Sequence, residues 1–137
     1  MLDTPAARTA REPAAALPGP ATVTVTTTYE HTVVAIAGDI DLAVTAQVQE
    51  RLHNELRLRP EALIIDLTDV AFCSSGGLSV LLEAVTTAHG GGLPCAVVAA
   101  QRAVLRPARL LRLDRHLPIH PTLADAETWL SLVAQLR

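Results

Sequence analysis

The sequence predicts an α/β fold with one mixed, mostly parallel β-sheet of four to five strands packed against about four helices. Three observations carry this prediction. Apolar runs of strand length alternate with segments whose apolar residues recur every three or four positions, a pattern typical of parallel sheets with helical crossovers. The length of 137 residues fits one domain. Half of the residues are hydrophobic but few are aromatic, which predicts an aliphatic core.

The first 20 residues are expected to form a disordered tail. Prolines lie there among alanines, without periodicity and with few of the large side chains that would anchor a segment. Order is expected from Ala21 onward. Residues 21–137 are therefore expected to form the single folded domain.

A β-hairpin is expected at the start of this domain. Thr and Val alternate over residues 22–28, as in a half-buried strand, and residues 32–37 form a second apolar strand. Residues 29–31 between them fit a turn. The Gly-Asp-Ile-Asp segment at 38–41 is expected to end the second strand.

The remaining elements are expected to alternate between helix and strand. Valines and leucines recur every four residues from Val44 to Leu56 and predict a helix that Pro60 ends. A central strand is expected at 63–67, followed by a helix that comes after residues 74–77 and runs to 89. The elements expected next are a strand at 95–99, a helix from about 102 to 112 and a short strand at 117–119. A last helix is expected, capped by Thr122 or its neighbour.

Composition and charge argue against several classes of protein. The net charge of −3 and the scarcity of aromatic side chains give no basis for binding nucleic acid. No apolar stretch approaches the ~20 residues that span a bilayer, and no signal peptide is recognisable. A cytoplasmic protein without membrane insertion is therefore expected. Cys73 and Cys95 match no metal or redox spacing and are expected to be buried, reduced thiols.

Residues 72–78, Phe-Cys-Ser-Ser-Gly-Gly-Leu, lie between the central strand and the helix that follows it. The free N–H groups and the dipole at a helix start favour negative charge. The serines therefore either cap the helix or form a site where an anion such as a phosphoryl group matters. A nucleophile elbow is absent because no Gly-x-Ser-x-Gly is present, and no Gly-Lys-Ser/Thr follows as in a P-loop.

Asp39 and Asp41 form the second polar segment of interest. Two residues apart after a strand, they fit turn hydrogen bonds or the polar rim of a docking surface better than an acid–base pair. No catalytic residue, metal or cofactor is expected. The arginines between residues 102 and 115 are expected to form a solvated helix face.

Two segments together resemble the STAS domain of bacterial anti-sigma-factor antagonists. Residues 66–78, Asp-Leu-Thr-Asp-Val-Ala-Phe-Cys-Ser-Ser-Gly-Gly-Leu, are similar to the family pattern Asp-Leu-Ser-x-Val-x-Phe-x-Asp-Ser-Ser-Gly-Leu. Residues 38–43, Gly-Asp-Ile-Asp-Leu-Ala, are similar to its Gly-Glu-Leu-Asp-Leu. The resemblance covers residues 21–136. It implies a partner-binding surface that includes Asp39, Asp41, Ser74, Ser75, Gly76 and Gly77.

The same resemblance implies a non-enzymatic regulator. Its partner would be an anti-sigma factor that is also a serine-protein kinase, and binding would free the sigma factor for transcription. The alternative role within the family is the STAS subunit of an ABC-type phospholipid-transport complex, which binds an ATPase.

The sequence departs from the family pattern at the phosphoacceptor. In the family, the kinase phosphorylates the residue before the Gly-Leu pair, where this chain has Gly76. Ser75 is then the candidate phosphosite, one residue upstream and turned by about 100° around the helix. The alternative is a protein that binds constitutively. A phosphate would add about −2 charge to the docking surface and block it.

Overall fold

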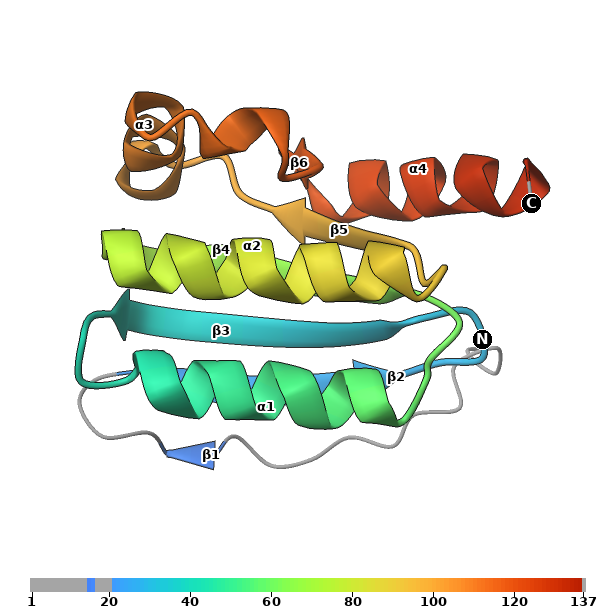
Figure 1. Cartoon of the computed structure of the whole chain (residues 1–137), viewed down its shortest axis with the longest axis horizontal. Coiled ribbons are helices and arrows are strands. Elements are labelled where there is room, and N and C mark those ends of the chain that lie inside the picture. Colours follow the sequence, from blue (N-terminus) through green and yellow to red (C-terminus); the bar gives the residue numbers. More distant parts are fainter. Residues whose placement is uncertain (1–14, 17–20, 137) are drawn as a thin grey trace.

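The structure is a computed structural model that describes residues 15, 16 and 21–136 (Figure 1). Apart from the short strand at residues 15 and 16, the tail expected over residues 1–20 lies outside the described residues. The predicted fold class is confirmed, because the strands of a single sheet alternate along the chain with four α-helices.

The elements have the following bounds. The strands are β1 (Ala15–Ala16), β2 (Thr22–Thr27), β3 (Thr32–Ile40), β4 (Leu63–Cys73), β5 (Cys95–Val98) and β6 (Ile119–His120). The helices are α1 (Thr45–Arg57), α2 (Ser75–Gly90), α3 (Arg102–Leu110) and α4 (Leu123–Gln135), with a 3-10 turn η1 at Leu113–Arg115.

The sheet is mixed, with its strands in chain order from β1 to β6. β2 pairs antiparallel with β3, which confirms the predicted hairpin, and β3 to β6 are all parallel. β1 adds a sixth, two-residue strand at the edge by pairing with β2. The sequence of this segment does not predict a strand, because its alanines carry neither alternation nor β-branched side chains.

The two central strands are longer than predicted, and this difference shapes the functional site. β3 continues past Gly38, where the sequence predicts its end, as far as Ile40, and β4 continues to Cys73. The register between them shifts twice, first between Ala35 and Ala37 and again between Gly38 and Asp39. Each shift gives β4 one extra residue, a β-bulge that bends the strand while pairing resumes beyond it. Gly38 has a φ of +99°, which suits glycine and explains why this apparent breaker lies within a strand.

Each face of the sheet buries its own set of apolar side chains. The larger core joins β2 to β5 with α1, α2 and α3, and it includes the fully buried Ile36, Ile65 and Leu81. The smaller core lies on the opposite face, where α4 packs Ala126 and Leu130 against β4 and β5. Burial on both faces explains why the first residues of β4 form the unbroken apolar run seen in the sequence.

The ends of the last two helices follow from local chemistry. The Thr122 hydroxyl accepts a hydrogen bond from the Asp125 N–H at 3.1 Å, which confirms the predicted cap of α4. α3 contains Pro107 and stops at Leu110, slightly before the predicted end. Within the part of the chain that the structure describes, no helix has the length and apolar character needed to cross a membrane.

Candidate functional site

Ser74 caps α2, as one of the two interpretations of the serine segment predicts. Its backbone is extended, with φ −70° and ψ 164°, and its Oγ accepts a hydrogen bond from the Gly77 N–H at 3.0 Å. Its carbonyl oxygen accepts the first helical hydrogen bond, from the Leu78 N–H at 3.0 Å. The Ser74 hydroxyl therefore uses one acceptor position to cap the helix.

Ser75 is the first residue of α2, and its side chain is exposed. Its hydroxyl makes no hydrogen bond to any residue that the structure describes. Backbone N–H groups in the first turn of a helix lack partners within the helix, so this position favours negative charge. Of the two serines in the segment, Ser75 thus has the more exposed hydroxyl, and it makes no hydrogen bond within the described residues.

The two glycines that follow have opposite roles. A Cβ on Gly76 would lie in ordinary contact with the Leu42 side chain, 3.5 Å from Cδ2. A Cβ on Gly77 would lie only 2.8 Å from Ile40 Cγ2 and 3.1 Å from Cys73 Sγ. Gly77 is buried, so it supports the site by letting α2 pack closely on the ends of β3 and β4.

The Asp39–Asp41 segment lies beside the start of α2, as the sequence predicts. The Ser74 N–H donates to the Ile40 carbonyl oxygen at 2.8 Å and so joins the ends of β3 and β4. Asp41 forms a turn in which its Oδ1 accepts from the Ala43 N–H at 3.0 Å. Asp39 is opposite Phe72 in the register, on the sheet face away from the larger core.

The site also contains two exposed apolar side chains that were not predicted as site members. Leu42 is 78% exposed and lies against the bare backbone of Gly76, and Phe72 is 50% exposed at the end of β4. Leu42 lies outside the four-residue spacing of the α1 core positions, and this is the sequence signal that could have found it. We treat these residues as a candidate docking surface, hereafter called the docking surface; it consists of Leu42, Phe72, Ser75 and Gly76 with the rim residues Asp39 and Asp41.

Gln101 holds the bulged end of β4 in place, and no sequence signal marks it. β4 pairs with β5 only as far as Asp66, so the carbonyl groups beyond that point lack a strand partner on that side. The Gln101 side-chain amide donates to the carbonyl oxygens of Leu67 at 2.6 Å and Val70 at 2.8 Å. One side chain thus satisfies two main-chain acceptors that the strand ladder leaves free.

Replacing Gln101 with Ala is expected to lower the free energy of unfolding by about 1–3 kcal/mol, because two main-chain acceptors would lose their donor. The loss is measured by urea denaturation followed by circular dichroism. Gln49→Ala is the matched control, since the Gln49 amide donates only to the exposed Glu83 carboxylate. Equal stability of the two variants would contradict the role given to Gln101.

Neither cysteine contributes reactive chemistry to the site. Both are free and buried, as predicted. Burial raises the pKa of the Cys73 thiol to about 11 and that of Cys95 to about 12, so the reactive thiolate is scarce at neutral pH. No cluster of three or more metal-ligating side chains occurs among the residues that the structure describes. The arginines of α3 and the segment after it are exposed, in agreement with a solvated face.

Comparison with known proteins now connects this geometry to a family. Residues 22–126 match the family model of the STAS domain. The chain is 36% identical over 111 residues to the anti-sigma-F factor antagonist RsfB of Mycobacterium tuberculosis, which covers 81% of this chain and 90% of RsfB.

Solved structures agree with this match. A crystal structure of an anti-sigma factor antagonist from Mycobacterium paratuberculosis superposes with a TM-score of 0.74 at 30% identity, covering 85% of this chain and 99% of that one. A structure of a variant of RsbS from Moorella thermoacetica superposes with a TM-score of 0.70 at 25% identity, covering 82% of this chain and 97% of that one.

Proposed function

This chain belongs to the STAS domain family, and we propose that it is an anti-sigma-factor antagonist that acts through the docking surface. Both Mycobacterium relatives carry that name, and they match nearly their full lengths. We therefore favour the antagonist over the phospholipid-transport role, and place the protein in the cytoplasm with its partner.

The observation that carries the proposal is the combination of an exposed leucine and a bare helix start. Leu42 exposes most of its side chain and lies beside Gly76, which has no Cβ, at the start of α2. A partner that docks on the start of α2 can therefore bury the Leu42 side chain. Apolar anchors surrounded by polar groups are typical of the residues that dominate binding energy at interfaces.

We further propose that the partner is an anti-sigma factor of the serine-kinase type and that Ser75 is the residue through which it regulates binding. Ser74 is engaged as a cap and Gly76 has no hydroxyl, so Ser75 offers the exposed acceptor of this segment. A phosphate there would be tolerated by the helix start but would place about −2 charge between the two proteins. Such a modification would release the partner without unfolding the antagonist.

Leu42→Ala is expected to weaken binding to the cognate anti-sigma factor by 10-fold or more. Fully burying a leucine side chain at an interface is worth about 1.5–3 kcal/mol, which corresponds to this loss. Isothermal titration calorimetry with the kinase-like anti-sigma factors of the same genome measures it.

Leu132→Ala is the matched control, because Leu132 on α4 is also exposed, at 55%, but lies outside the docking surface. It should bind like the unaltered protein. If no kinase-like anti-sigma factor of the genome bound the unaltered protein, the proposed function would fail. If the two leucine variants lost affinity equally, the location of the surface would be wrong.

A further inference from the structure

A cavity of about 440 Å³ lies at the end of the sheet opposite the docking surface. It is bounded by the turn between β2 and β3, the residues before β4 and β5, and α4. β4 runs from this cavity at Leu63 to the docking surface at Cys73. The cavity is therefore separate from the site to which the proposed function belongs, and its size is within the range of small-molecule sites, about 300–1,000 Å³.

The inner wall of the cavity is apolar. Ala62 precedes β4, Pro94 precedes β5, and Leu130 lies on the inner face of α4; all three line the cavity and are buried. These three side chains carry no polar group. This wall suits an aliphatic chain or a ring of a ligand.

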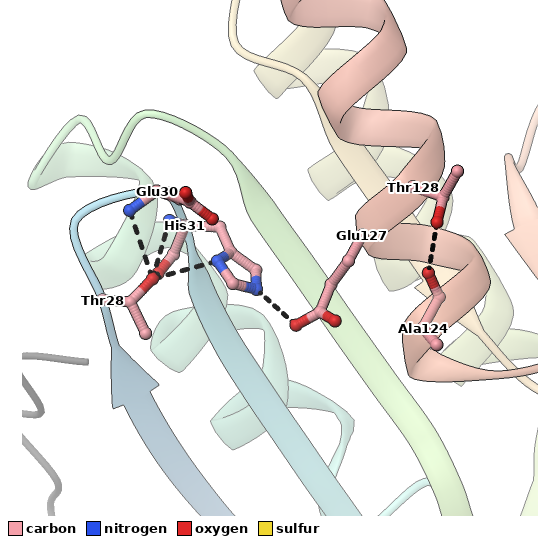
Figure 2. A network of polar contacts seen from close by, with 6 residues as sticks. All are labelled: Thr28, Glu30, His31, Ala124, Glu127 and Thr128. Carbon is pink, nitrogen blue, oxygen red and sulfur yellow. Dashed lines mark hydrogen bonds and ion pairs between the residues drawn. The ribbon is translucent and has the colours of Figure 1, made fainter. Parts of the chain in front are cut away.

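One side of the cavity is held in place by a polar network that joins α4 to the β2–β3 turn (Figure 2). His31 Nε2 lies 3.0 Å from Glu127 Oε2, and His31 Nδ1 lies 3.0 Å from Thr28 Oγ1. The Thr28 hydroxyl also accepts from the Glu30 N–H at 3.2 Å. Both nitrogens of the imidazole are therefore occupied, and the wall of the cavity has a defined shape.

The ionisable side chains that line the cavity are mainly acidic. Glu30, Glu61 and Glu127 line it, and none of the described residues in its lining is a lysine or arginine. The basic side chain in this lining is that of His31, which is already paired with Glu127. Among the described residues, Glu30 and Glu61 have no ion-pair partner. Tyr29 adds an aromatic ring, a group that attracts cations to its face, at the same opening.

We propose that this cavity binds a small organic cation, with an ammonium or guanidinium group carried on a short apolar chain. The apolar part lies against Ala62, Pro94 and Leu130, and the positive group faces the carboxylates of Glu30 and Glu61. An anion would be repelled by the same carboxylates, and a neutral apolar molecule would gain nothing from their charge. The buried apolar wall and the acidic side chains at the opening together favour a ligand that is both apolar and positively charged.

The proposal is tested by titrating three six-carbon probes into the ¹⁵N-labelled protein and following amide signals by NMR. Hexylamine, which is cationic at pH 7, is expected to cause saturable shifts confined to residues 29–31, 61–62 and 127–134. Hexanol, which has the same chain without the charge, should bind at least 10-fold more weakly, and hexanoate should cause no shift at this site. Equal binding of hexylamine and hexanol would overturn the proposal.

Variants separate a specific site from general attraction to a negatively charged protein. Changing Glu30 and Glu61 together to Gln should weaken hexylamine binding at least 10-fold, and both residues are exposed, so the fold should be retained. Glu50→Gln removes an exposed carboxylate on α1, away from the cavity, and should change nothing. Equal effects of these variants, or shifts spread over the whole surface without saturation, would overturn the proposal. Neither outcome depends on the anti-sigma factor.

Discussion

Gly77→Ala is expected to destabilise the protein by about 1–3 kcal/mol, although alanine is intrinsically the better helix former by about 1 kcal/mol. The added methyl would lie 2.8 Å from Ile40 Cγ2 and 3.1 Å from Cys73 Sγ. Ile40 is fully buried and its Cγ2 is a branch methyl that cannot swing away, so α2 or the end of β3 has to move. Packing in the core, not helix propensity, therefore decides the sign.

Gly76→Ala is the matched control, one residue away in the same helical turn. Its Cβ would meet nothing closer than Leu42 Cδ2 at 3.5 Å, so this variant should be as stable as the unaltered protein or up to about 1 kcal/mol more stable. Urea denaturation of the two variants measures the difference. If both variants proved equally stable, the close contact between α2 and the ends of β3 and β4 would be disproved.

Ser75→Glu is expected to weaken binding to the anti-sigma factor by roughly 10- to 100-fold while the free energy of unfolding stays unchanged or rises. A carboxylate in the first turn of α2 interacts favourably with the helix dipole, by about 0.3–1 kcal/mol. In the complex, the same charge would lose its water between two proteins, on a surface that already carries Asp39 and Asp41. Stability and affinity should therefore change in opposite directions, which a damaged fold would not produce.

Calorimetry and urea denaturation measure the two quantities on one sample. Thr86→Glu serves as the control, since Thr86 is exposed on the same helix about three turns further on. It adds the same charge and should leave affinity within two-fold. In the presence of ATP and a kinase-type partner, mass spectrometry should find a phosphate on Ser75 that is absent from Ser75→Ala. A phosphate elsewhere on α2 with Ser75 unmodified would contradict the assigned phosphosite.

The order of elements could be predicted because its signals are local. Alternation of Thr and Val marks β2, the four-residue spacing from Val44 marks α1, and Thr122 marks the start of α4. Each signal depends on residues within a few positions of one another, where backbone geometry sets the period. The lengths of β3 and β4 could not be predicted in this way, because bulges let them pair beyond an apparent breaker.

Residue patterns alone were enough to predict the fold class, the family resemblance and the segment that carries the site, including the missing hydroxyl at Gly76. The packed structure was needed to divide that segment into a cap at Ser74, an exposed hydroxyl at Ser75 and a buried packing position at Gly77. It also brought Leu42 to the helix start. The physical reason is that exposure and close contact depend on neighbours far away in the chain, and spacing along the sequence carries no information about them.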